Sequence, residues 1–75
     1  MTDIPEDSDA ARARVRQLLL SGDNIIKNRD NPTRFARARE RYAQARDVAA
    51  AAGLGPQVTT IIELRIAQID SDGGA

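Results

Sequence analysis

The sequence predicts an all-α fold, a small domain of three helices in which neighbouring helices run antiparallel. First, the chain has 75 residues, which suits one domain with a single modest core. Second, apolar residues recur at steps of three and four in successive segments, as on the buried face of a helix. Third, short stretches rich in Asn, Gly and Pro separate these segments, and short breaks favour antiparallel packing of the helices that they join.

The N-terminal segment, residues 1–8, is expected to be a disordered acidic leader, because Pro5 opposes an early helix. Ser8 or Asp9 suits the N-cap of the first helix, and the nearby acidic side chains stabilise the positive end of the helix dipole. This helix is expected over residues 9–29. The leader lacks a basic region followed by an apolar run, so it does not read as a signal peptide, and a cytoplasmic location is expected.

The first helix raises one question, which is whether it continues through Gly22. Residues 21–24, Ser-Gly-Asp-Asn, could form a turn that splits the helix. Alternatively, the glycine could lie inside the helix and let a neighbouring helix approach closely. Because the apolar pattern continues across the glycine to Ile25, a continuous helix is favoured. Its apolar face comprises Ala11, Val15, Leu18, Leu19, Gly22, Ile25 and Ile26.

The second helix carries the clearest apolar stripe in the chain. The stripe comprises Phe35, Ala38, Tyr42, Ala45, Ala49 and Ala52. The only Phe and the only Tyr of the protein belong to it, so Phe35 and Tyr42 are expected to be largely buried against the first helix near Gly22. The other members are alanines, whose methyl groups bury little area but permit close approach of two helices.

The boundaries of the second helix, expected over residues 32–52, carry typical start and stop signals. Asn31 is a natural N-cap, and Pro32 fits the first helical position, where a missing N–H costs nothing. Gly53 is the expected left-handed residue that ends the helix, after which Leu54 can fold back onto the last turn.

The third element, residues 56–70, fits two structures. Its β-branched residues and the alternation of apolar and charged residues near its centre would suit a strand. A helix is favoured, because a lone strand would have nothing to pair with inside this chain. The helical stripe then comprises Val58, Ile62, Ile66 and Ile69. Ile61 and Leu64 fall to the side of that stripe, where they are candidates for contact with a partner, and residues 71–75 are expected to be a flexible tail.

Small and aromatic residues follow a regular spacing in the first two helices. Ala38, Tyr42 and Ala45 give a small–aromatic–small pattern, and Gly22 provides a small residue in the preceding helix. This pattern resembles the tetratricopeptide repeat family, in which it lets paired helices nest. The resemblance covers about residues 10–70, or about one and a half repeats, and implies a TPR-like packing of the helices. In this sequence the stretch from Gly22 to Ala38 is about one turn longer than in that family.

The break between the second and third helices offers another resemblance. An alanine, then Gly53 four residues later and then an apolar residue resemble the turn of a DNA-binding helix-turn-helix, here over residues 47–62. Thr59, however, lies where that family has an aliphatic residue. The positions that would read bases, Gln57, Thr60 and Ile61, include no Arg or Lys, although direct readout requires donors that reach into the major groove.

The charge of the chain is balanced overall but unevenly distributed. Residues 12–46 carry ten basic and three acidic side chains, whereas both ends of the chain are acidic. In the second helix, Arg34, Arg37 and Arg41 form one flank, and Arg39 and Arg46 form the other. An anionic partner would relieve the repulsion within a flank, and nucleic-acid phosphate or an acidic peptide would serve. The simpler interpretation is a solvated face whose arginine stems cover the edge of the core.

The composition argues against catalysis. The chain contains no Cys and no His, which excludes disulfides, thiol nucleophiles, imidazole bases and almost every zinc or haem site. No predicted nucleophile lies beside a base, and no Gly-rich loop follows a strand. The protein is therefore not expected to be an enzyme, and no catalytic residue, cofactor or metal is predicted. No apolar stretch approaches the roughly 20 residues needed to span a bilayer, so no membrane partner is expected.

The expected function is protein–protein interaction, with another protein or a second copy of the chain as the partner. The candidate partner-binding residues are Arg34, Arg37, Arg41, Ile61 and Leu64. The alternative is a nucleic-acid-binding module that uses the arginines of the first two helices, although nucleic acid is not the expected partner of a chain whose net charge is zero. A third alternative is a piece of a longer repeat protein, since helical repeats normally need at least about three copies for stability.

Overall fold

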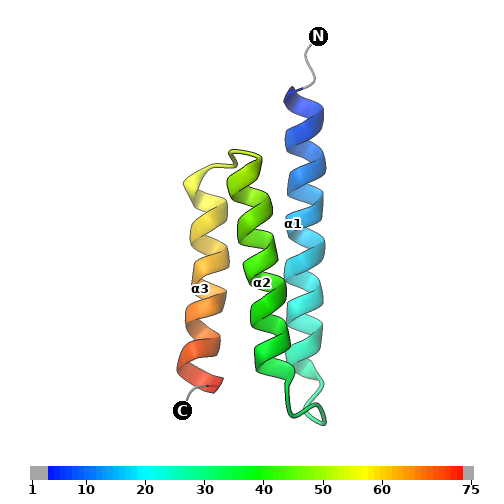
Figure 1. Cartoon of the computed structure of the whole chain (residues 1–75), viewed down its shortest axis with the longest axis vertical. Coiled ribbons are helices and arrows are strands. Elements are labelled where there is room, and N and C mark those ends of the chain that lie inside the picture. Colours follow the sequence, from blue (N-terminus) through cyan, green and yellow to red (C-terminus); the bar gives the residue numbers. More distant parts are fainter. Residues whose placement is uncertain (1–3, 74–75) are drawn as a thin grey trace.

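The computed structural model describes the backbone of residues 4–73 and the side chains of residues 9–71. Three helices account for nearly all of these residues: α1 (Ile4–Lys27), α2 (Arg34–Ala51) and α3 (Pro56–Gly73). In Figure 1, α2 lies between α1 and α3, and each helix runs antiparallel to the next. The described part of the chain contains no strand, so the predicted all-α fold is confirmed, including the helical third element.

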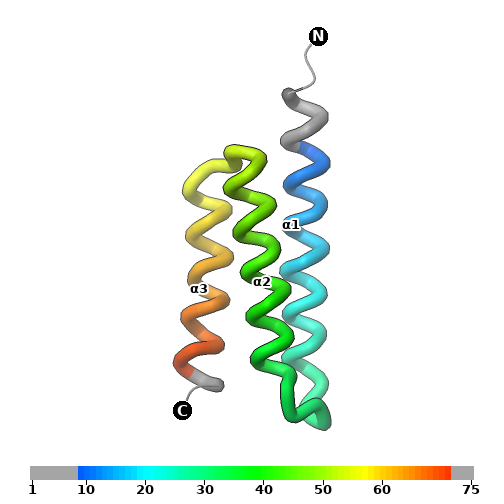
Figure 2. The backbone as a smooth tube through the Cα atoms, viewed as in Figure 1, coloured from blue at the N-terminus to red at the C-terminus, as the bar shows by residue number. Residues whose placement is uncertain are grey.

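The three helices form a shallow row rather than a closed bundle. The molecule measures 48 × 20 × 13 Å along its principal axes, and α2 makes extensive contacts with both neighbours, more with α1 than with α3. The tube in Figure 2 shows the same row of three helices, and Figure 1 shows that the first turns of α1 extend beyond the ends of the other two helices. The central position of α2 follows from its sequence, because its alanine stripe lets both neighbours approach one face.

The boundaries of α1 differ from the predicted ones. The helix begins at Ile4 instead of near Asp9, so residues 4–8, which were expected to belong to a disordered leader, are helical. Pro5 does not prevent this, because a proline in the first turn removes no helical hydrogen bond. The rest of the expected leader lies outside the described residues. The prediction that the helix continues through Gly22 is confirmed, since α1 is unbroken as far as Lys27.

The start of α2 is also displaced. The helix begins at Arg34, not at Pro32, and Thr33 occupies the N-cap position without a capping side-chain hydrogen bond. Asn31 organises the turn that comes before it: its Oδ1 accepts hydrogen bonds from the backbone N–H and the hydroxyl of Thr33, both at 2.9 Å. Its carbonyl oxygen accepts the N–H of Arg34 at 3.2 Å. The prediction that Asn31 is the N-cap of this helix is therefore wrong, and its side chain stabilises the connecting turn instead.

The end of α2 matches the prediction. Gly53 has φ +67°, a conformation that strains any residue with a Cβ atom. The N–H of Leu54 donates to the carbonyl of Ala49 at 2.9 Å, and the N–H of Gly53 donates to Ala50 at 3.2 Å, which together form a Schellman motif. Leu54 is half-buried against the core. This turn directs the chain into α3, which continues to Gly73, so part of the expected flexible tail is helical and the remainder lies outside the described residues.

The core lies where α1 and α3 cover the alanine stripe of α2. Its buried members are Ala11, Val15, Leu18, Ala38, Tyr42, Ala45, Ala49, Ile62, Ile66 and Ile69. Tyr42 and Ile62 are the largest fully buried side chains, as the stripes of α2 and α3 predict. Phe35 was expected to be largely buried but is only half-buried, because it lies in the first turn of α2. The guanidinium of Arg34 covers part of its ring, 4.6 Å from the ring centroid.

Candidate functional site

A polar junction joins the C-terminal part of α1 to the middle of α2 and of α3. The hydroxyl of Tyr42, on α2, donates a hydrogen bond to Oδ1 of Asp23, on α1, at 2.5 Å. Arg65, on α3, donates from Nε to Oδ1 and from Nη2 to Oδ2 of the same carboxylate, at 3.2 and 3.3 Å. One carboxylate therefore binds a side chain from each of the other two helices. We refer to Asp23, Tyr42 and Arg65 as the polar junction.

The electrostatics of the polar junction favour its present protonation states. Partial burial alone would raise the pKa of Asp23, but the hydrogen bonds from Arg65 and Tyr42, together with the charges of Arg65 and Lys27, outweigh burial and hold that pKa below its ordinary value. Burial and the hydrogen bond to Asp23 raise the pKa of Tyr42. The hydrogen bond to Asp23 raises the pKa of Arg65. Asp23 is thus an anion and Tyr42 is a neutral donor at neutral pH.

These protonation states limit what the junction can do chemically. A general base must take up a proton, but the hydrogen bonds from Arg65 and Tyr42 outweigh burial and hold the pKa of Asp23 below its ordinary value, so this carboxylate is a weak base. A phenol whose pKa is raised is a poor nucleophile at neutral pH. The neighbouring cavity, about 220 Å³ in volume, is lined by the junction and by Ile26, Phe35, Gln68 and Ile69. We interpret the junction as a clamp that fixes the relative positions of the three helices.

A groove between α1 and α3 begins one helical turn from the polar junction. It has a volume of about 270 Å³ and is lined by Arg12, Val15, Arg16 and Leu19 of α1 and by Val58 and Ile61 of α3. Leu19 precedes Asp23 by four residues, and Ile61 precedes Arg65 by the same number, so the Asp23–Arg65 ion pair closes one end of the groove. We refer to this hollow as the α1–α3 groove.

The outward face of α3 carries two of the predicted partner-binding residues. Ile61 is 48% exposed and Leu64 is 65% exposed, in agreement with their position beside the buried stripe. The residues that share this face are Gln57, Thr60, Ile61, Leu64, Ala67 and Gln68. None of them is charged, although Glu63 and Asp70 lie along one edge of this face and Arg65 lies along the other. We refer to these residues as the α3 face.

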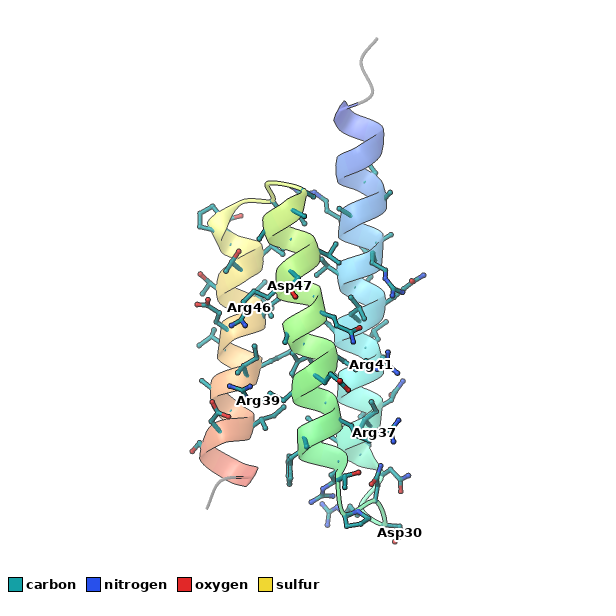
Figure 3. All side chains as sticks on the ribbon, viewed as in Figure 1. Asp30, Arg37, Arg39, Arg41, Arg46 and Asp47 are labelled. Carbon is teal, nitrogen blue, oxygen red and sulfur yellow. The ribbon has the colours of Figure 1, made fainter. Side chains whose placement is uncertain are left out.

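The predicted arginine flanks are present on α2, although their members differ in environment. Figure 3 shows Arg37 and Arg41 on the side of α2 near α1, and Arg39 and Arg46 on the side near α3. Arg39 pairs with Asp70 of α3, Nε to Oδ1, at 3.0 Å. Arg37 is exposed and Arg41 half-buried. Within the described residues, neither forms an ion pair.

Arg34, the third arginine of the first flank, is engaged within the fold. Besides stacking on Phe35, it donates from Nη1 to the carbonyl of Ile26 at 3.4 Å. This contact connects the start of α2 to the last turns of α1. Of the five predicted partner-binding residues, Arg34 therefore already has a structural role.

The geometry of α2 and α3 differs from that of a DNA-binding helix-turn-helix. In such motifs the two helices cross at roughly 90–120°. Here α2 and α3 lie side by side along their length (Figure 1). Residues 47–62 thus resemble that motif in the sequence of their turn but not in the arrangement of their helices.

Two features of the surface were not predicted from the sequence. The polar junction joins residues separated by up to 42 positions, and the only sequence signal for it was that Asp23 and Arg65 fall at helical positions beside apolar stripes. Leu20 is 55% exposed, because it lies on the side of α1 away from the buried stripe, where it lines a shallow hollow together with Ile25 and several polar residues. Because three leucines follow one another, the sequence alone did not indicate that Leu20 is more exposed than Leu18 and Leu19.

Comparisons with other proteins provide no family assignment. No family model matches the chain, and no curated protein or solved structure matches it. Within residues 4–73, none of the helices combines the length and the apolar character required to cross a bilayer. The side chains that the structure describes include no cluster of three acidic residues that could hold a metal ion.

Proposed function

We propose that the chain is a small cytoplasmic protein–protein interaction module that self-associates through the α3 face. The observation that carries this proposal is the exposure of Ile61 and Leu64 on a helix face without charged residues. Single exposed aliphatic side chains are common on protein surfaces. Two of them three residues apart on a helix face without charged residues form a small apolar patch, and exposed apolar patches mark interaction sites.

A second copy of the chain is the partner that this surface fits most simply. A two-fold contact needs one self-complementary patch, and two antiparallel copies of α3 can pack with Leu64 of each copy near Ile61 of the other. Burying the exposed parts of these two side chains would contribute about 1 kcal/mol apiece in each copy. The loss of translational and rotational freedom offsets much of that gain. The proposed dimer is therefore weak and forms mainly at high protein concentration.

Sedimentation analysis over a range of protein concentrations tests this proposal. The parent should shift from monomer to dimer, and the Ile61→Lys, Leu64→Lys double variant should remain monomeric and folded. Leu20→Lys is a matched control, because Leu20 is also a large exposed aliphatic residue but lies on α1; this variant should dimerise like the parent. A parent that is monomeric at every concentration would overturn the proposal, as would equal loss of the dimer in the control.

The alternative function, nucleic-acid binding, has one observation in its favour. Arg37 and Arg41 lie close together on α2, and no described carboxylate forms an ion pair with either of them. Phosphate binding depends steeply on salt concentration, whereas apolar self-association does not. A titration with random duplex DNA at several salt concentrations therefore separates the two functions. Sub-micromolar, salt-sensitive binding that Arg37→Glu abolishes would favour nucleic acid.

A further inference from the structure

We propose that the α1–α3 groove is a second docking site, which adjoins the α3 face at Ile61, and that it binds an acidic amphipathic peptide segment of another protein. The partner would place apolar side chains in the groove and carboxylates against Arg12 and Arg16. The proposal does not depend on self-association. The two surfaces share Ile61, but Leu64 belongs only to the α3 face, and the two arginines belong only to the groove.

The floor of the groove is apolar and comes from two helices. Leu19 of α1 and Val58 of α3 are half-buried, Ile61 is about half exposed, and Val15 is buried beneath them. Leu19 and Val58 also pack against the core, so the floor is part of the folded structure. Aliphatic side chains that are anchored in a core and open to solvent on one side suit an apolar side chain from a partner.

The rim of the groove has a positive charge on one side only. Arg12 and Arg16 are exposed and one helical turn apart on α1, so they repel each other at i, i+4. Within the described residues, no carboxylate forms an ion pair with either of them. On the opposite rim, the α3 face contributes no charged side chain. A partner with acidic residues along one edge would complement this asymmetry, whereas a basic or neutral partner would not.

The shape of the groove is set before any partner arrives. The Asp23–Arg65 ion pair holds α1 and α3 together one turn beyond Leu19 and Ile61, and Tyr42 fixes the same carboxylate from beneath. The walls of the groove are helices, whose backbone geometry is rigid compared with a loop. A preformed groove reduces the conformational entropy that is lost on binding. The polar junction thus fixes the distance between the two walls of the docking site.

The partner that fits is a helix with apolar residues at i, i+3 and i+4 and with Asp or Glu on one adjacent flank. Such a helix can lie along the groove in contact with both walls, because α1 and α3 run in the same direction (Figure 1). The acidic flank must face α1, since both arginines belong to that helix. The groove therefore selects for a partner helix whose acidic residues lie on one side of its apolar stripe and not on both.

Selection from a displayed library of random peptides against the whole chain tests the proposal. Enriched peptides should combine an apolar helical stripe with Asp or Glu on one flank. A synthetic copy of the strongest peptide should then bind the parent in a fluorescence titration. The Arg12→Glu, Arg16→Glu variant should weaken that binding by about tenfold or more, because two attractive contacts become repulsive. Leu64→Lys should leave binding unchanged, which separates this site from the α3 face.

The matched control is Arg37→Glu, Arg41→Glu. It changes the net charge by the same amount, also at i, i+4 on a helix, but neither residue lines the groove. Peptide binding should change by less than about threefold in this variant, because neither arginine lines the groove and water and salt screen charges that a partner does not contact. Circular dichroism should show the same helical signal in all variants, since the substituted side chains do not belong to the buried core.

Several results would overturn the proposal. No enriched peptide, or enriched peptides that are basic or neutral, would show that the rim does not select for acidic partners. Equal loss of binding in the two double variants would show that net charge, not the groove, determines binding. Duplex DNA that displaces the peptide and itself requires Arg12 and Arg16 would assign these arginines to phosphate.

Discussion

Replacing Gly22 with alanine tests the close approach of α1 and α2. A Cβ atom at this position would lie 2.9 Å from both Cδ1 and Cζ of Tyr42, well inside the optimal separation of about 3.5–4.0 Å between carbon atoms. The tyrosine ring cannot easily retreat, because it is 1% exposed and its hydroxyl is bound to Asp23. The added methyl group therefore has to separate the two helices or displace the ring from the polar junction.

The size of the effect follows from three contributions. Overpacking a close contact costs about 1–3 kcal/mol. A weakened hydrogen bond between Tyr42 and the charged Asp23 adds about 1 kcal/mol or more. Alanine has a better helix propensity than glycine, which offsets about 1 kcal/mol of this destabilisation. We expect a net loss of about 2 kcal/mol in the free energy of unfolding, which corresponds to a fall of about 10 °C in Tm for a domain of this size.

Thermal and urea unfolding followed by circular dichroism measure this loss. Gly55→Ala is the matched control, because a Cβ atom at Gly55 would meet nothing within 4 Å and the backbone there does not have positive φ. This control should be as stable as the parent. If Gly22→Ala were also as stable as the parent or more stable, the close packing of α1 against Tyr42 would be refuted.

Three further predictions concern other contacts. Gly53→Ala should lower the free energy of unfolding by about 1 kcal/mol in urea titrations, because φ +67° strains an L-residue although the site is open. Thermal melts should show that the protein loses stability below about pH 4. The pKa of Asp23 is lower in the folded state, so its contribution to stability is present above the ordinary pKa and is lost as the pH falls through the folded-state pKa. Asp23→Asn should remove this part of the acid dependence. Arg39→Ala should change the free energy of unfolding by less than about 0.5 kcal/mol, since both side chains of its pair with Asp70 are at least half exposed.

The helices were predictable because their signals are local. The stripe of α2, the helical nature of α3 and the left-handed Gly53 each depend on residues within a few positions of one another. The continuity of α1 through Gly22 could be predicted for the same reason. The predicted start of α1 was wrong, because a proline near the N-terminus is compatible with both a helix start and a disordered segment.

The candidate sites were predictable only in part. The exposure of Ile61 and Leu64 follows from the phase of the α3 stripe, so the sequence indicates the α3 face. The α1–α3 groove and the polar junction depend on the register between two helices that are not consecutive in the chain, and no local pattern determines that register. The resemblance to tetratricopeptide repeats stays a prediction, since it concerns packing style and no comparison bears on it.

The unequal attachment of the outer helices to α2 has a consequence for how the protein opens. α3 has fewer contacts with α2 than α1 has. The Arg39–Asp70 ion pair adds to the contacts of α3 with α2, and the Arg65–Asp23 ion pair attaches α3 to α1. We therefore expect α3 to detach as a unit while the α1–α2 hairpin remains paired, a partial unfolding with a smaller free energy than global unfolding. Native-state hydrogen exchange would show this as amides of α3 that exchange sooner than those of α2. In that open state the apolar stripe of α3 is exposed and can pack against α2 of another copy, so partial unfolding allows domain swapping of α3 between two copies.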